Sequence, residues 1–232
     1  ILFSNWLTLM SDFNSMRINM VNNQIKPFAV TDTKILDAFG EIPRENFSQY
    51  SNEAIIYSDN IVYLSNKKKY QSRFYLSPAI LAKMIQIADI QNDEKILEIG
   101  CLTGYSSTIL SKLCKKVFAI DNDQELIDIA NSNVKELGIS NITFAHNALK
   151  DGYPKKAPYD LIFIHGSIEV LPDDISSQIR ENGRIVTISN NKNVGNVVVF
   201  KKAGSVLDKI NYFEISVPYI SKEFIKKNKF TF

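Results

Sequence analysis

Short apolar segments alternate with a helical pattern from residue 95 onward, and this alternation constrains the fold more than any other feature. Residues 123–137 place their apolar side chains on one helical face, and Gly138 provides a stop after them. A strand, a helix and a strand repeated in this order require crossovers between parallel strands. We therefore predict an α/β fold with a buried, mostly parallel sheet. The predicted strands are 95–100, 117–121, 142–146, 160–165 and 184–189.

The two ends of the chain differ from this pattern. Residues 196–201 and 212–219, separated by a turn-like Ala-Gly-Ser, predict an antiparallel pair at the end of the sheet. Near the other end, Asp32 is expected to cap a helix, and an irregular, aromatic-rich stretch follows. Because this part has too few periodic apolar positions for its own core, we predict that residues 1–78 form a helical and lid segment packed on a domain of residues 79–232.

The composition narrows the class of protein without naming a partner. The 232 residues are 45% hydrophobic and 22% charged, with a net charge of +2, which favours neither a nucleic-acid nor a membrane partner. Cys101 and Cys114 fit no disulfide or metal-ligand spacing, so we predict no metal site and a cytoplasmic location. We expect Lys67–Lys69 to be a solvated loop. Residues 1–10 do not fit a signal peptide, and translation from Met10 or Met16 is an open alternative.

Residues 97–107 (LEIGCLTGYSS) occupy the place where open α/β sheets bind ligands, just after the first strand of the alternating region. Gly100 lets the chain leave the strand in a tight turn, and Gly104 lets the next helix start close to a ligand. Asp121 ends the second strand, where a carboxylate can accept hydrogen bonds from both hydroxyls of a ribose. The spacing Glu-x-Gly-x-x-x-Gly differs from the G-x-G-x-x-G of dinucleotide sites and resembles the S-adenosylmethionine loop of Rossmann-like methyltransferases. A tight turn without a ligand is the alternative.

The predicted cofactor-binding residues come from this loop and from the ends of the next two strands. Tyr105 opens the helix, where backbone N–H groups can meet a cofactor carboxylate. The full set is Glu98, Gly100, Cys101, Gly104, Tyr105, Asp121, Asn122 and Asn147.

A closer resemblance lies upstream of this loop. Residues 42–47 (IPRENF) resemble the V-P-R-E-x-F segment of protein-L-isoaspartate O-methyltransferases, and further segments follow the order of that family from Arg17 to at least Val186. These segments are residues 20–25, 57–59, 137–138 with 141–142, 152–154 and 157–160. The resemblance implies a Rossmann-like sheet, S-adenosyl-L-methionine as cofactor, and repair of isoaspartyl proteins or peptides by methyl transfer to the misplaced α-carboxylate.

Three departures from the family pattern fall on the site. Leu102 stands at the middle glycine of G-x-G-x-G, where its side chain could crowd the cofactor or force another loop path. Asn147-Ala148-Leu149 replaces a G-D-G triplet, so the Asp that reaches the adenine is absent. Phe74 and Leu76 replace the hydroxyl residues of T-I-S-x-P. A different acceptor, such as a small molecule, and a non-catalytic binding protein on the same fold are therefore open alternatives.

No catalytic residue can be carried over from the resemblance. Ser77 is adjacent to the replaced hydroxyl position, and His165 ends the fourth strand beside the expected pocket, where it could act as a base. The alternative for His165 is a hydrogen-bonded side chain at a strand end.

Overall fold

The computed structural model describes residues 12–48, 53–64, 72–191 and 194–226. The predicted loop at Lys67–Lys69 and the alternative start at Met10 lie outside these ranges.

A seven-stranded sheet forms the centre of the molecule, with the strand order β5-β4-β3-β6-β7-β8-β9. The pairs from β5 to β7 are parallel, whereas β8 and β9 add antiparallel pairs at one edge. The predicted α/β class and its terminal antiparallel pair are therefore confirmed. The strands are β3 (Lys95–Ile99), β4 (Lys116–Asp121), β5 (Ile142–His146), β6 (Tyr159–Ile168), β7 (Ile179–Asn191), β8 (Val194–Ala203) and β9 (Val206–Glu214).

The last strand lies earlier in the chain than its predicted range of 212–219. Gly204 takes a left-handed conformation (φ +60°), and the hairpin pairs directly on both sides of it, beginning with Ala203 opposite Val206. Residues 206–212 are mostly solvent-exposed, so they lack the apolar alternation on which the prediction relied. Beyond β9 the chain turns back towards β6, where the Ser167 amide donates to the Pro218 carbonyl at 3.1 Å.

The helices flank this sheet, and a second sheet of two antiparallel strands, β1 (Val62–Tyr63) and β2 (Phe74–Tyr75), lies in the N-terminal part. No helix among the described residues is long and apolar enough to cross a membrane. The described part of the chain begins with helical residues 12–20. Further helical elements are η1 (Val21–Ile25), η2 (Lys26–Phe28), α2 (Thr33–Glu41), η3 (Arg44–Phe47), α3 (Glu53–Ile56), α4 (Pro78–Ala88), α5 (Tyr105–Ser111), α6 (Gln124–Glu136), η5 (Leu149–Asp151), η6 (Pro154–Lys156), α7 (Asp173–Ser176) and η7 (Lys222–Phe224).

Capping side chains set the start of α2 and α6, two of the helices that the sequence predicted. Asp32 accepts a hydrogen bond from the Lys34 amide at 2.8 Å, and Asp123 accepts one from the Glu125 amide at 2.9 Å. Gly138 follows α6 in a left-handed conformation (φ +66°).

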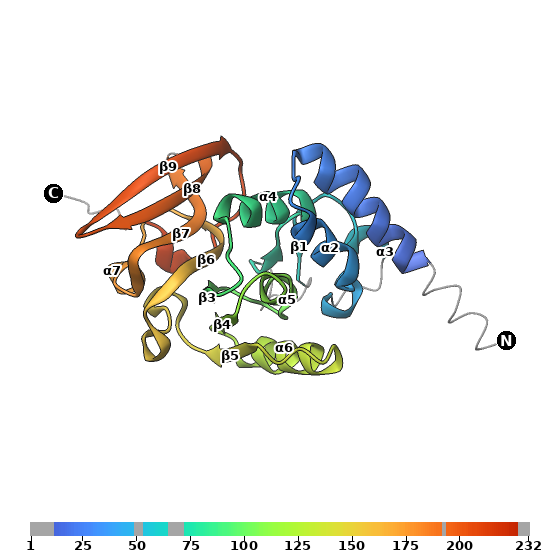
Figure 1. Ribbon diagram of the computed structural model, residues 1–232, viewed down its shortest axis with the longest axis horizontal. Coiled ribbons are helices and arrows are strands. Elements are labelled where there is room, and N and C mark those ends of the chain that lie inside the picture. Colours follow the sequence, from blue (N-terminus) through green and yellow to red (C-terminus); the bar gives the residue numbers. More distant parts are fainter. Residues whose placement is uncertain (1–11, 49–52, 65–71, 192–193, 227–232) are drawn as a thin grey trace.

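The core has two parts because successive residues of a strand face opposite sides of the sheet. In β3, Ile96 packs with α4 and the N-terminal helices, whereas Leu97 and Ile99 pack on the other face near η7. Figure 1 shows the N-terminal helices, in blue, at one end of the molecule and the β8–β9 hairpin, in orange to red, at the other. Buried residues of the N-terminal helices thus belong to the same core as this face of the sheet.

Arg44, from the Pro-Arg-Glu segment, attaches this N-terminal part to the site. Its buried guanidinium donates to the carbonyl of Ile56 at 2.9 Å and to that of Leu76 at 3.2 Å. Its Cζ atom also lies 4.8 Å from the centre of the Tyr105 ring, on the first turn of α5. The motif therefore holds this N-terminal segment, which we call the lid segment after its predicted role, against the helix that follows the β3 loop.

Candidate active site

The loop between β3 and α5 is attached to the end of β4. The backbone amides of Gly100 and Cys101 both donate to the carbonyl of Ile120, at 2.9 and 3.1 Å. The Gly104 amide donates to the Cys101 carbonyl at 2.9 Å and closes the turn. The loop therefore lies at the carboxyl ends of two parallel strands, which is where α/β sheets bind ligands.

Gly100 and Gly104 are both in left-handed conformations, with φ of +87° and +93°. A Cβ atom at Gly100 would lie 2.8 Å from Cδ1 of Ile220, and one at Gly104 would lie 3.0 Å from Cζ of Phe144. The backbone conformation thus favours glycine at both positions, and the side chains of Ile220 and Phe144 would have to shift to admit a Cβ atom. The first contact also shows that the C-terminal segment, through Ile220, covers the loop.

Leu102 takes the left-handed conformation that a glycine would take there (φ +53°). Its side chain is buried and packs in a small apolar cluster with Val62, Leu64, Tyr75 and Leu126. The loop therefore accommodates the leucine by directing it into the lid segment and α6. An L-residue in this conformation costs about 1 to 2 kcal/mol, which the apolar contacts offset.

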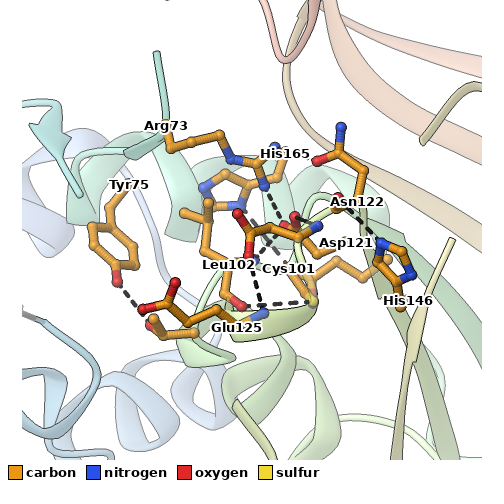
Figure 2. A network of polar contacts seen from close by, with 12 residues as sticks. Arg73, Tyr75, Cys101, Leu102, Asp121, Asn122, Glu125, His146 and His165 are labelled. Carbon is orange, nitrogen blue, oxygen red and sulfur yellow. Dashed lines mark hydrogen bonds and ion pairs between the residues drawn. The ribbon is translucent and has the colours of Figure 1, made fainter. Parts of the chain in front are cut away.

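Asp121 is fully buried at the end of β4 and joins the loop to the lid. Its carboxylate accepts hydrogen bonds from the amides of Leu102 at 3.0 Å and Asp123 at 3.2 Å. The Arg73 guanidinium forms an ion pair with the same carboxylate and donates to Oδ1 of Asn122 at 3.1 Å (Figure 2). The acid that was predicted to bind a ribose is thus covered by a cation from the lid.

Glu98 and His165 form a second buried pair below the loop. Nε2 of His165 accepts from the Leu76 amide at 3.4 Å, so its ring proton lies on Nδ1, which is 4.0 Å from Oε1 of Glu98. Ser107 donates to the other oxygen of this carboxylate. These two facing atoms of Glu98 and His165 have no hydrogen-bond partner among the described residues.

Burial moves the pKa values of this pair in opposite directions. It raises the pKa of Glu98 to about 7, with the nearby charge of Asp121 adding to the rise and the Ser106 and Ser107 hydrogen bonds opposing it. It lowers the pKa of His165 to about 3, and the positive charges of Arg44 and Arg73 add to this effect. His165 is therefore a neutral imidazole at pH 7.

The side chains of Cys101 and Tyr105 have structural roles in this arrangement. The Cys101 thiol is buried, and burial raises its pKa well above the ordinary value, which keeps it protonated. The Tyr105 ring packs edge-on against Phe39 and Phe47 in the lid segment. Tyr105 can therefore contact a ligand at the loop through its backbone and not through its hydroxyl.

Two further candidates are held by local hydrogen bonds. Asn147 follows β5, where its backbone amide donates to the Asp121 carbonyl at 3.0 Å and its side-chain amide donates to the Gly152 carbonyl at 2.5 Å. Ser77 caps α4 by accepting from the Ile80 amide at 3.4 Å. The structure therefore brings Asn147 to the strand ends and gives the Ser77 hydroxyl a capping role.

A groove of about 710 Å³ adjoins the Asp121 end of the site. Its walls come from the lid, the start of α6 and the C-terminal segment, and they include Tyr63, Ser72, Arg73, Asn122, Asp123, Pro218, Tyr219, Ile220, Ser221, Lys222 and Ile225. A smaller cavity of about 10 Å³ lies between Gly100, Leu102 and His165 and is closed by Arg73, Phe74 and Ile220. Arg73 and Ile220 thus line both spaces.

Sequence reasoning missed Arg73 and Ile220. Arg73 has no periodic neighbours and belongs to no predicted motif, and Ile220 directly follows the strand predicted at 212–219. The resemblance of residues 97–107 to a cofactor loop does not extend to either residue, so it could not indicate that they line the site.

The model of the family described as protein-L-isoaspartate(D-aspartate) O-methyltransferase matches residues 15–223. The chain belongs to this family. The predicted resemblance is therefore confirmed over a slightly longer range than the quoted segments covered.

Individual relatives agree with this assignment. Protein-L-isoaspartate O-methyltransferase 1 of Syntrophobacter fumaroxidans is 30% identical over 76% of this chain and 80% of its own length. Protein-L-isoaspartate O-methyltransferase of Opitutus terrae is 31% identical over 73% of this chain and 71% of its own length.

Solved structures give the same fold. One protein-L-isoaspartate O-methyltransferase superposes with a TM-score of 0.79 at 25% identity and covers 91% of this chain and 67% of that chain. A β-aspartate methyltransferase from Plasmodium falciparum, solved with S-adenosyl-L-homocysteine, gives a TM-score of 0.73 at 16% identity, over 89% and 98% of the two chains. The Rossmann-like architecture of the sheet follows from these superpositions.

At most positions an alanine variant is more stable than a glycine variant, and we expect the opposite order of stability at Leu102. L102A loses the buried side chain but keeps the left-handed strain, so we expect it to lower the free energy of unfolding by about 3 kcal/mol. L102G loses the same contacts but relieves the strain, so it should be more stable than L102A by about 1 kcal/mol. Urea unfolding measures both values.

Leu126, in the same cluster but within α6, provides the matched control. There glycine should be less stable than alanine by about 1 kcal/mol because the backbone is helical. Affinity of L102G for S-adenosyl-L-homocysteine should equal that of the wild type, since the loop already follows the path of a glycine. A tightening would show that the leucine crowds the pocket after all.

Glu98 and His165 should give opposite pH dependences of stability. The folded state keeps a proton on Glu98 up to about pH 7, so the contribution of Glu98 falls as pH rises from 4.5 to 7. The contribution of neutral His165 is present above pH 6.5 and is lost as pH falls towards 3. Each slope is at most about 1.4 kcal/mol per pH unit.

Two variants separate these contributions. Between pH 4.5 and 6.5, the unfolding free energy of E98Q should rise with pH relative to the wild type, and that of H165Q should fall. Urea unfolding at a series of pH values measures both, and the other titratable groups cancel in the comparison. Parallel profiles for the two variants would contradict the assignment.

Proposed function

We propose that this chain transfers the methyl group of S-adenosyl-L-methionine to the α-carboxylate of isoaspartyl residues in proteins or peptides. The observation that carries this proposal is the family match over residues 15–223, with the Gly100–Gly104 loop placed over Asp121 at the carboxyl ends of β3 and β4. The proposal also requires that the hydrogen-bonding groups of the site suit S-adenosyl-L-methionine.

The donors and acceptors of the site fit such a cofactor. Gly100 and Gly104 leave backbone close to the ligand position, and the Asp121 carboxylate suits the two hydroxyls of a ribose. The side chain of Asn147 lies at the end of β5 beside that position and is proposed to contact the base. Space at the loop is limited to the cavity of about 10 Å³, so Arg73 and Ile220 have to move before a ligand can lie against Gly100.

The chain itself has few chemical tasks in this reaction. When bound, S-adenosyl-L-methionine supplies a sulfonium methyl group. The acceptor carboxylate is already ionised near pH 7, so the chain needs no strong base and has only to orient it and exclude water. Phe74 and Leu76 surround this region with apolar groups, and His165 adds a neutral ring. Such surroundings favour a transfer in which opposite charges are neutralised.

A cytoplasmic location belongs to the same proposal. It is supported by the two cysteines, Cys101 and Cys114, which are buried as free thiols.

The activity is tested with labelled S-adenosyl-L-methionine, an isoaspartyl peptide and the matching aspartyl peptide. We expect a base-labile methyl ester on the isoaspartyl peptide alone. D121A should lose detectable turnover because it removes the proposed acceptor of the ribose hydroxyls.

Calorimetry with S-adenosyl-L-homocysteine separates the alternatives. Binding without ester formation, while a known enzyme is active in parallel, would point to a different acceptor, including a small molecule. Absence of binding at millimolar concentration would point to a non-catalytic protein on this fold, the alternative that the Arg73–Asp121 ion pair favours.

A further inference from the structure

Arg73 forms an ion pair with Asp121, the acid proposed to bind a ribose. The backbone of Arg73 is fixed by a hydrogen bond, whereas its side chain can move. Its backbone carbonyl accepts from the Leu64 amide at 2.8 Å within the small sheet of the lid. Its side chain extends from there to Asp121 and Asn122 (Figure 2). Rotation of the side chain alone can therefore move the guanidinium while the lid stays in place.

The ion pair and a ribose compete for the same carboxylate. Oδ2 of Asp121 already accepts from the Leu102 amide, and Oδ1 accepts from the Asp123 amide, so both oxygens have one lone pair used by the backbone. Arg73 covers the side of the carboxylate that faces the lid. Arg73 must leave Asp121 before this carboxylate can accept hydrogen bonds from two hydroxyls.

A guanidinium released at this place needs another anion, because the side chain is only 11% exposed. It lines both the groove of about 710 Å³ and the small cavity beside Gly100. Among the described residues that line the groove, the other cation is Lys222, and the acid, Asp123, already caps α6. The groove therefore favours an anionic ligand.

We propose that Arg73 is the binding residue for the acceptor's α-carboxylate and that it is stored on Asp121 until the cofactor occupies the site. This role rests on the proposed methyltransferase function. Arg suits it because its planar fork binds a carboxylate by two parallel hydrogen bonds. The acceptor thereby compensates for the ion pair that cofactor binding breaks, and the two ligands bind with positive coupling.

The chemistry of the step agrees with this role. One oxygen of the carboxylate forms a bond to the methyl carbon while the carbon–sulfur bond breaks, and its electron pair goes to sulfur. Both the sulfonium charge and the carboxylate charge disappear. Arg73 then faces a neutral ester, so its attraction for the product falls and Asp121 can take it back as the product leaves.

R73Q is the central variant, and R180Q is its matched control. Arg180 forms an ion pair with Asp160 on the surface, remote from the groove, so R180Q makes the same charge change without touching the site. R73Q should bind S-adenosyl-L-homocysteine about tenfold more tightly than the wild type in calorimetry, because no ion pair has to break. R180Q should match the wild type, and unchanged or weaker binding by R73Q would overturn the proposal.

The acceptor arm uses peptide binding to protein saturated with S-adenosyl-L-homocysteine, so it does not depend on turnover. An isoaspartyl peptide should bind R73Q at least tenfold more weakly than the wild type, whereas its α-carboxamide counterpart should bind both equally. R73K should lie between them, since lysine keeps the charge but not the fork. Equal loss for both peptides would overturn the role of Arg73 in carboxylate binding.

This design also distinguishes the two proposals. A wild-type protein that shows these binding differences but forms no methyl ester would refute the proposed reaction and leave the carboxylate role of Arg73 supported. A protein that forms the ester with equal KM in the wild type and R73Q would refute the role of Arg73 alone.

Discussion

The Asp121 carboxylate is the point on which the site depends, because four parts of the chain meet there. It ends β4, accepts from the β3 loop through the Leu102 amide, accepts from the start of α6 through the Asp123 amide, and pairs with Arg73 of the lid. A buried carboxylate is stable only when its oxygens are paired, so these donors are a requirement of the fold as well as a property of the site. A ligand that takes one of these places changes the contacts of the lid.

Leu102 shows how a departure from a family pattern can preserve the geometry of a loop. The backbone keeps the left-handed turn, and the side chain takes part in a cluster with lid and α6 residues. The lid is consequently attached near this loop by both the apolar cluster and the Arg73 ion pair. The first contact involves no charge and can persist while the second breaks, which allows the side chain of Arg73 to move under a stationary lid.

The sequence predicted those features that depend on periodicity or local conformation, and it missed those that depend on contacts between distant segments. Strands β3 to β7, the cap at Asp32, the helix α6, and the positions of Gly100 and Asp121 all follow from residues close in the chain. The contact of Ile220 with Gly100 joins segments 120 positions apart, and its residues carry no pattern that announces it. Arg73 was missed for a related reason, since a long flexible side chain can reach partners that its neighbours do not indicate.

The charged and titratable residues of the site, Glu98, Asp121, Arg73 and His165, are compatible with one reaction. Two buried acids, Glu98 and Asp121, and the guanidinium of Arg73, which is 11% exposed, lie at the site, and burial keeps His165 neutral and raises the pKa of Glu98. A sulfonium and a carboxylate lose their charges when they react, and surroundings that solvate separated charges poorly favour that loss. An ion pair with Arg73 stabilises the charged carboxylate, so Arg73 would bind the acceptor only until methyl transfer removes that charge. The same arginine can therefore bind the anionic substrate and release the neutral ester. When no acceptor is bound, Asp121 is its partner.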